Sequence, residues 1–140
     1  MNFSHLTVKT DGEGFYDITE EVKNKLNKMT KPNQKSGVLH LIITHTSCAL
    51  TINEAFDPSA AKDMEEFLKY LAPRNLPFIK HTAEGPDDSP SHMKSILLNH
   101  SLTLIIDAQE IMLGQWQGIY LAEFRDHKKE RKVLLKFQAD

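Results

Sequence analysis

Strand-like segments that follow one another directly constrain the fold of this chain more than any other feature of its sequence. About six occur, rich in β-branched and aliphatic residues or alternating in polarity, at residues 3–10, 38–45, 48–53, 102–106, 116–124 and 132–137. Only turns separate the last three, one around Gly114 and a charged hairpin from Asp126 to Glu130. Consecutive strands favour antiparallel pairing over alternating βαβ units. The sequence therefore predicts an α+β fold built on an antiparallel sheet.

Two or three helices are predicted around these strands. Their apolar residues recur at helical spacing in segments that run from Asp17 to Met29, from Asp57 to Leu71 and from Ser89 to Leu97. Each begins with a residue type that caps helices, and Pro58 and Pro90 follow two of these caps. Glu20, three residues after Asp17, suggests a capping box in the first helix. In the third, Met93, Ile96 and Leu97 are expected to face inward.

Composition excludes several classes of protein. A length of 140 residues supports a single domain, 1–140, and 40% hydrophobic content excludes a long disordered chain. The 17 Lys and Arg against 19 Asp and Glu argue against nucleic acid as a partner. Apolar runs such as Leu41-Ile42-Ile43 are too short to span a membrane, and the N-terminus lacks the features of a signal peptide. With Cys48 as its only cysteine, the chain is expected in the cytoplasm.

The loop HTAEGPDDSPSH, residues 81–92, is the clearest candidate for chemistry. It places three carboxylates and two histidines within twelve residues. Such a mixed set suits zinc or manganese, whereas carboxylates with water suit magnesium. The prolines on either side of Asp87-Asp88 would hold these carboxylates in place. The alternative is a solvated acidic loop with hydrogen-bonded or surface histidines, because the spacing of His81 and His92 matches no standard zinc motif.

Three further clusters carry polar side chains. In HTSCALTINE, residues 45–54, His45 and Ser47 would share one strand face and could bind phosphate or orient water, although such faces are also common structural features. In LGQWQG, residues 113–118, Trp116 offers a flat surface or simply a core tryptophan beside a turn. Farther on, Glu123, Arg125 and His127 alternate, which fits either a solvent face or one wall of an anion site. No GxGxxG or GxxxxGK[ST] motif occurs.

Three long segments carry a family resemblance: HTSCALTINEAFDPSAAKDMEEFL (45–68), HTAEGPDDSPSHMKSILL (81–98) and LGQWQGIYLAEFRDH (113–127). Together they resemble the YjbQ family, formerly an uncharacterised protein family and described as secondary thiamine-phosphate synthase enzymes. The resemblance covers essentially the whole chain. It implies an antiparallel β-sandwich core with two or three peripheral helices, a homotrimer, and a polar pocket for a divalent metal ion (zinc, manganese or magnesium). The implied reaction joins a pyrimidine diphosphate to a thiazole phosphate, giving thiamine phosphate and pyrophosphate.

The resemblance and the polar clusters together give a set of candidate site residues. Those expected to hold the metal are His45, His81, Glu84, Asp88 and His92. Those expected in catalysis are Asn53, Glu54, Asp88 and Arg125. Those expected to bind substrate are Ser47, Lys94, Trp116, Gln117 and Arg125. In this scheme Arg125 and Lys94 bind phosphate, and Trp116 stacks on a heteroaromatic ring.

Three functions fit these residues. The leading hypothesis is a transferase acting on a phosphorylated small molecule, since loss of pyrophosphate requires its charge to be neutralised by a divalent cation or by Arg and Lys. The second is a metal-dependent hydrolase of a small phosphorylated or amide substrate, and the third is a non-catalytic metabolite-binding module. The sequence leaves open the physiological substrate, the metal, whether His127 joins the site and whether the site lies between subunits.

Overall fold

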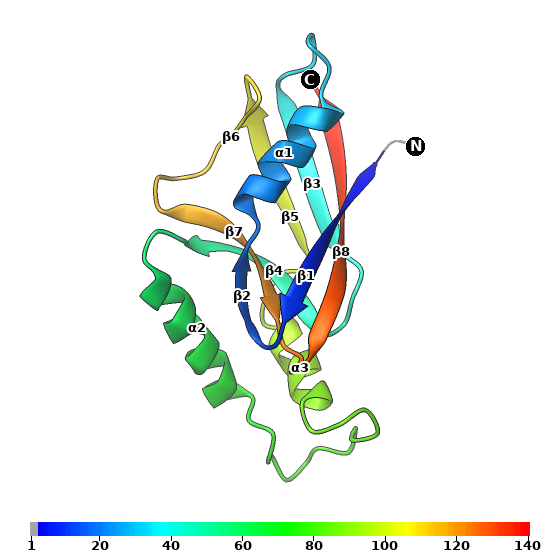
Figure 1. The fold of residues 1–140 in the computed structure, drawn as a ribbon, viewed down its shortest axis with the longest axis vertical. Coiled ribbons are helices and arrows are strands. Elements are labelled where there is room, and N and C mark those ends of the chain that lie inside the picture. Colours follow the sequence, from blue (N-terminus) through cyan, green and yellow to red (C-terminus); the bar gives the residue numbers. More distant parts are fainter. Residues whose placement is uncertain (1–2) are drawn as a thin grey trace.

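Two antiparallel sheets and three helices make up residues 3–140, the part of the chain that the computed structural model describes (Figure 1). The strands are β1 (Ser4–Asp11), β2 (Gly14–Asp17), β3 (Gly37–Ile43), β4 (Cys48–Glu54), β5 (Ser101–Asp107), β6 (Glu110–Ile111), β7 (Gln117–Glu123) and β8 (Lys128–Ala139). The helices are α1 (Thr19–Met29), α2 (Pro58–Leu71) and α3 (Asp88–Ser95). The larger sheet has the order β1-β8-β3-β5-β6 and the smaller β2-β7-β4. The predicted α+β fold with antiparallel sheets is confirmed.

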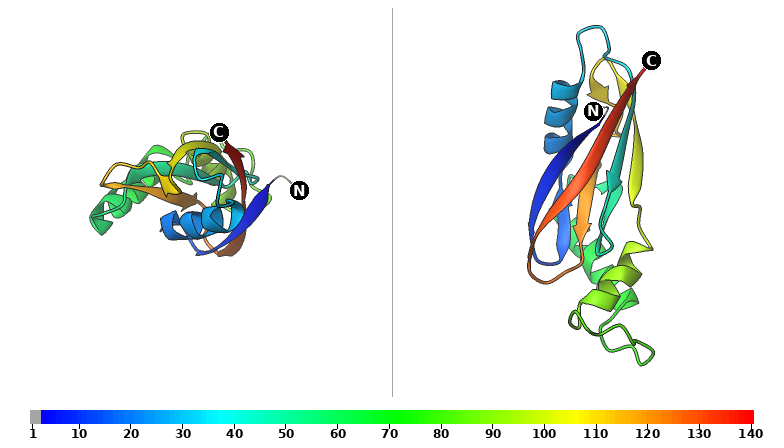
Figure 2. Two further views of the ribbon diagram at one scale, coloured as in Figure 1. Left: turned by 90° about the horizontal axis from the view of Figure 1, so that it is seen from above. Right: turned by 90° about the vertical axis from the view of Figure 1, so that its right-hand side faces the viewer.

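The main core lies between the inner faces of the two curled sheets and helix α1 (Figures 1 and 2). Alternate residues of β3, such as Leu39 and Leu41, are fully buried there, as expected for strands with one solvated face. From the smaller sheet, Leu50 and Leu121 complete the layer. Helix α1 adds Val22 and Leu26, four residues apart on one face. A second, smaller cluster covers the other face of the small sheet and holds Leu68, the one buried residue of α2.

Two strands were not predicted: β2, with four residues, and β6, with two. Both are too short to show a pattern of alternating polarity. Strand β8 begins at Lys128, inside the segment predicted to be an exposed hairpin. Opposite charges face each other across its ladder with β1, where Lys128 pairs with Asp11 and Glu130 with Lys9. A run of charged residues is thereby accommodated in a strand.

The helix starts are confirmed in part. Asp57 caps α2 as predicted and accepts a hydrogen bond from Ser59 N–H at 2.9 Å. Helix α1 has Ile18 as its N-cap, because Asp17 lies one residue earlier and accepts from Thr19 N–H. Among the described residues, no capping box forms at this helix.

The prediction for α3 is wrong in two respects. The helix begins at Asp88, not after Ser89, and the residues that it buries include Asp88, Ser91 and Lys94. Ile96 and Leu97 follow its last turn and are 80% and 55% exposed. The inward face is polar because it packs on charged groups at the end of the sheets, as described below.

The chain passes from one sheet to the other at one end of the molecule, between β1 and β2, between β3 and β4, and between β7 and β8. Helix α3 lies at this end, at the bottom of Figure 1. We call this region the corner and define it by Thr10, Ser47, Glu123, Arg125 and Arg131, which are all buried. The corner is therefore a polar region beside an apolar core.

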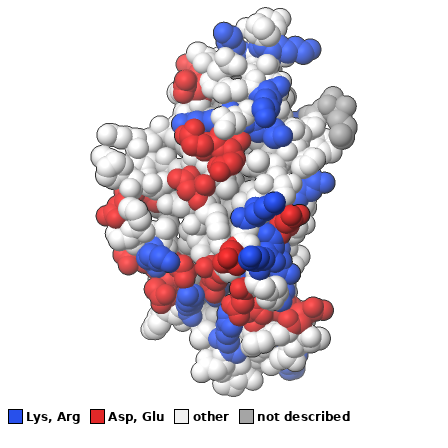
Figure 3. All heavy atoms as spheres, in the orientation of Figure 1, with Lys and Arg blue, Asp and Glu red and all other residues white. Residues whose placement is uncertain are grey.

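On the face seen in Figure 3, Lys and Arg side chains are interspersed with Asp and Glu side chains. Several charged residues of the described chain form local ion pairs, such as Lys69 with Glu65 at 2.7 Å along helix α2. Within residues 3–140, no helix combines the length and the apolar character needed to cross a membrane.

The unequal burial of the helices gives a stability prediction. Replacing Leu26 by Ala is expected to lower the free energy of unfolding by about 2–5 kcal/mol, because the fully buried side chain leaves a cavity in the main core. Leu71→Ala, in the half-exposed end of α2, is the matched control and should cost about 1 kcal/mol or less. Urea unfolding of the two variants measures both values. Equal losses would contradict the placement of the core.

Candidate metal centre

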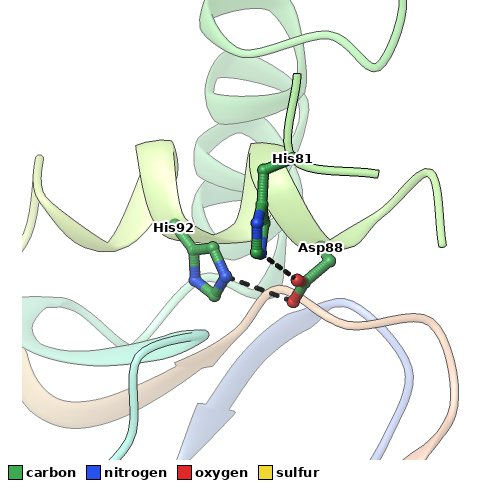
Figure 4. Close-up of side chains that lie close together, drawn as sticks. All are labelled: His81, Asp88 and His92. Atoms are coloured by element: carbon green, nitrogen blue, oxygen red, sulfur yellow. Dashed lines mark hydrogen bonds and ion pairs between the residues drawn. The ribbon is translucent and has the colours of Figure 1, made fainter. Parts of the chain in front are cut away.

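Three side chains that can bind a metal ion converge beside the corner: His81, Asp88 and His92 (Figure 4). One potential ligand atom from each lies within 4.8 Å of the others. The Asp88 carboxylate lies between the two imidazole rings, with Oδ2 2.8 Å from His81 Nε2 and Oδ1 3.3 Å from His92 Nε2. Two imidazoles and one carboxylate are a donor set typical of transition-metal sites in proteins.

Helix α3 brings two of these residues together. Asp88 and His92 are four residues apart, so they lie on the same face of its first two turns. His81 comes from the preceding loop, and its ring centroid lies 5.4 Å from that of His92. Asp88 is buried, whereas His81 is exposed and His92 is of intermediate exposure. The cluster therefore has a fixed carboxylate at its base and an open side toward solvent.

Arg125 fixes the acidic base of the cluster. Its Nη1 donates to Asp88 Oδ1 at 2.8 Å, its Nε to Asp87 Oδ2 at 2.9 Å, and its Nη2 to the main-chain carbonyl of Glu84 at 3.1 Å. Burial opposes ionisation of Asp87, but hydrogen bonds from Arg125 and from the Asp126 amide outweigh it and lower the pKa of this carboxyl to about 2. Arg125 thus contacts the cluster on its buried side, through Asp88.

The hydrogen bond of His92 reveals how its ring is protonated. Nδ1 lies 2.8 Å from the carbonyl oxygen of Thr46. A carbonyl only accepts, so Nδ1 must carry the proton. Nε2 then presents its lone pair toward Asp88 Oδ1 at 3.3 Å, so that a cation between the two atoms would be bound by both. An imidazole whose Nδ1–H binds a backbone carbonyl is also the arrangement common among metal-ligating histidines.

His45 is held in the same tautomer by a different contact. Its Nε2 accepts the Lys132 amide N–H at 2.9 Å, so its proton is on Nδ1. Burial and then the positive charge of Arg131 lower the pKa of His45. It therefore presents a neutral ring with an N–H donor at Nδ1. The structure does not include it in the three-residue cluster, and its Nε2 is already occupied.

A pocket of about 760 Å³ opens beside the cluster. Its lining residues are His45, Thr46, Cys48, His81, His92, Ser95, Ile96, Leu98 and His100. No Lys or Arg is among these described lining residues. This pocket could admit a small molecule to the open side of the cluster.

Of the remaining predicted residues, Ser47 and Lys94 have structural partners, whereas the Glu84 side chain and His127 are exposed. The Glu84 side chain is exposed, and its carbonyl is the group that meets Arg125. Ser47 is buried and accepts from Arg131 Nη2 at 2.8 Å. Lys94 is 3% exposed and forms an ion pair with Glu13 at 2.7 Å. His127 is exposed and lies outside the three-residue cluster.

Four further predicted residues are also absent from the lining of this pocket: Asn53, Glu54, Trp116 and Gln117. Glu54 Oε2 accepts the amide N–H groups of Phe56 and Asp57, just before α2. Trp116 and Gln117 line a separate pocket of about 400 Å³, where the Trp116 and Phe56 rings pack in a T-shaped arrangement with centroids 4.8 Å apart. Asn53 lines neither of these two pockets.

Sequence reasoning missed Arg131 and the carbonyl of Thr46. Arg131 lies between the predicted hairpin, which ends at Glu130, and the predicted strand 132–137, and it is buried and ion-paired with Glu123. Its signal is strand alternation, because Arg131, Val133 and Leu135 occupy alternate, buried positions of β8. A main-chain carbonyl leaves no signal in the residue types.

Comparison with known proteins gives the family. Residues 4–140 match the family model described as UPF0047 protein YjbQ-like. The chain belongs to this family. It is 41% identical over 135 residues to the UPF0047 protein YjbQ of Escherichia coli O157:H7, covering 96% of each chain. The UPF0047 protein MJ1081 of Methanocaldococcus jannaschii is 34% identical over 140 residues, covering 100% of this chain and 96% of that one.

Solved structures share the YjbQ-like fold. The conserved hypothetical protein TT1486 of Thermus thermophilus has a TM-score of 0.85 at 36% identity, covering 96% of this chain and 99% of that one. The hypothetical protein APE1520 of Aeropyrum pernix has a TM-score of 0.88 at 26% identity and covers all of both chains. These likenesses establish the family and the fold.

Cys48 in the pocket wall gives a prediction about reactivity. Burial raises the pKa of its thiol to about 12, despite the nearby charge of Arg131. At pH 8 roughly one thiol in ten thousand is then ionised, against about a quarter for an ordinary cysteine. A thiol reagent such as DTNB should therefore react with the folded protein at least about a thousandfold more slowly than with the urea-unfolded chain. Similar rates in the two states would show that Cys48 is accessible.

Proposed function

We propose that this YjbQ-family protein is a metal-dependent enzyme. It holds one divalent cation between His81, Asp88 and His92 and acts on a small phosphorylated substrate in the adjoining pocket. The observation that carries the proposal is the ring of His92, whose Nδ1 is committed to the Thr46 carbonyl while Nε2 faces a buried carboxylate at 3.3 Å.

The donor set indicates which ions fit. Two imidazole nitrogens and one carboxylate favour zinc or manganese over magnesium, which prefers oxygen ligands. Three protein ligands leave positions open for water or substrate, as in catalytic zinc sites. A bound divalent cation would polarise a phosphoryl oxygen and offset the charge of a leaving group. His45 adds a neutral N–H donor in the same pocket, and Arg125 keeps the Asp88 carboxylate in place.

The first reaction to test is that of a thiamine-phosphate synthase, which the family resemblance implies. In this transfer the thiazole nitrogen bonds to the methylene carbon of the pyrimidine as the carbon–oxygen bond to pyrophosphate breaks. The pocket lining contains histidines but no Lys or Arg among the described residues. Charge on the departing pyrophosphate would then be offset by the cation, with the His45 N–H as a hydrogen-bond donor, and Arg125 would act on Asp88, not on phosphate.

A metal-dependent hydrolase is the second candidate, and one observation favours it. Arg125 and Lys94, the cations expected to bind phosphate groups, are both buried in internal ion pairs. A site whose Lys and Arg are engaged in this way suits the attack of water on a small phosphorylated or amide substrate better than the handling of two phosphorylated substrates at once.

The proposed metal site predicts the metal content of the purified protein. Elemental mass spectrometry of the untagged protein should find near one zinc or manganese ion per chain. His81→Ala and His92→Ala should each weaken metal binding by at least about tenfold, because each removes a ligand. His40→Ala is the matched control, since His40 is an exposed histidine of β3 outside the pocket. A metal content no higher than background in the wild-type protein, after incubation with zinc and dialysis, would contradict the proposal.

Activity is tested with a pyrimidine diphosphate, with and without a thiazole phosphate. A synthase should release pyrophosphate only when the thiazole is present, and the rate should fall on chelation and in His92→Ala. Phosphate release without the thiazole would favour the hydrolase. Saturable binding without turnover under any metal would make the protein a metabolite-binding module. Turnover that survives both chelation and His81→Ala would contradict a metal mechanism.

The homotrimer implied by the resemblance is part of the proposal. Several large apolar side chains are more than half exposed, among them Phe56, Phe67, Tyr70, Phe78 and Ile96, which supports self-association. Light scattering of the purified protein should give the mass of three 16.0 kDa chains. A single-chain mass at micromolar concentration would contradict it.

A further inference from the structure

A buried ion pair at the corner lies just behind the candidate metal centre. The Glu123 side chain is fully buried and that of Arg131 is 5% exposed. Glu123 Oε1 accepts from Thr10 Oγ1 at 2.5 Å and from Arg131 Nε at 2.8 Å. Glu123 Oε2 accepts from Arg131 Nη2 at 2.5 Å. Both carboxylate oxygens are therefore satisfied inside the protein, as a buried charge requires.

One route from this pair leads to Asp88. Glu123 Oε2 also accepts the main-chain N–H groups of Phe124, at 3.1 Å, and Arg125, at 3.2 Å. These bonds fix the backbone at the residue whose guanidinium holds Asp88 Oδ1 at 2.8 Å. The orientation of the Asp88 carboxylate thus depends on the position of Glu123.

A second route leads to His92. Arg131 Nη2 donates to Ser47 Oγ at 2.8 Å and approaches the Ser47 carbonyl at 3.4 Å. Ser47 directly follows Thr46, whose carbonyl accepts from His92 Nδ1 at 2.8 Å and from Ser95 Oγ at 3.1 Å. The Thr46 carbonyl, which sets the tautomer of His92, thus lies next to Ser47, and Arg131 holds Ser47 by hydrogen bonds.

We infer that the Glu123–Arg131 pair positions the metal centre, through Arg125 for Asp88 and through Ser47 and Thr46 for His92. The inference rests on the proposed function for the metal itself, but the control of the His92 tautomer stands without it. Residues that orient metal ligands typically change metal affinity by 10–100-fold when they are replaced. Glu123 and Arg131 are positioning residues, because they touch neither the cluster's ligand atoms nor its pocket.

A purely structural role is the alternative, in which the pair only joins the two sheets. Both roles predict that loss of the pair lowers stability, so stability cannot distinguish them. Metal affinity and the tautomer of a ligand histidine can, because a structural pair leaves them unchanged in the folded protein.

The test uses Arg131→Gln, checked for folding by circular dichroism. Titration with Co²⁺, followed by its visible absorption bands, measures the affinity of the cluster. Nitrogen-15 NMR of the histidine rings, in the metal-free protein at about pH 8.5, reports the tautomer of His92. We expect Co²⁺ affinity to fall about 10–100-fold and His92 to lose its preference for Nδ1–H.

Lys94→Met is the matched control. It removes another buried ion pair, the one with Glu13, from the same helix that carries Asp88 and His92. Lys94 makes no hydrogen bond to Thr46 or Arg125 among residues 3–140. This variant should melt at a lower temperature yet keep the wild-type Co²⁺ affinity and His92 tautomer.

Ser47→Ala keeps the test decisive if Arg131→Gln fails to fold. It preserves the Glu123–Arg131 pair and removes only the hydroxyl that links Arg131 to the Thr46 segment. A several-fold loss of Co²⁺ affinity with a mixed His92 tautomer would support the inference. Wild-type tautomer and affinity in either folded variant would overturn it. Failure of the wild type itself to bind Co²⁺ would contradict the proposed function, and the tautomer comparison would still decide the positioning role.

Discussion

The buried contact between Glu123 and Arg131 is the interaction on which both the joining of the sheets and the candidate site depend. Burial raises the free energy of the Glu123 carboxylate, but hydrogen bonds from Arg131 and Thr10 outweigh this and keep the pKa of Glu123 below its usual range. Thr10 belongs to β1, Arg131 to β8, and Glu123 ends β7. Through Ser47 the pair also reaches the start of β4. This one ion pair therefore contacts β1, β4, β7 and β8 at the ends where the chain passes from one sheet to the other.

The site lies at this corner because the corner supplies polar partners that a sheet interior lacks. Strand ends there leave main-chain groups free of the ladders, and one of them, the Thr46 carbonyl, binds His92. Helix α3 closes the corner with Asp88, Ser91 and Lys94 turned inward. Because the helix packs on charged groups, its inner face is polar. The apolar Ile96 and Leu97, which follow its last turn, are left exposed. The same helix therefore carries two residues of the candidate site and packs against the buried charges at the end of the sheets.

Sequence patterns predicted the parts that depend on neighbouring residues. Content of β-branched and aliphatic residues predicted β3, and helical spacing predicted α1. The crowded 81–92 loop contains His81, Asp88 and His92, which the structure brings together, and Glu84, whose side chain stays apart from them. Long-range contacts decided the rest. The tautomer of His45 is set by an amide 87 positions away, at Lys132. Arg125 resembled a free phosphate ligand until the fold placed Asp87 and Asp88 against it, and Trp116 lies in a pocket separate from the histidines. Residue type indicates which side chains can bind a metal ion or a phosphate group. Only the tertiary structure shows which of them are already engaged by other residues.

The most direct measurement of the central claim is anomalous diffraction at the zinc absorption edge, from crystals of the untagged protein grown with zinc. One strong anomalous peak per chain is expected between His81 Nε2, the Asp88 carboxylate and His92 Nε2, with His92 Nδ1 still bound to the Thr46 carbonyl. Metal–nitrogen distances should be about 2.0–2.1 Å. A zinc peak elsewhere, with these three side chains unchanged and free of metal, would contradict the claim that they form the metal centre.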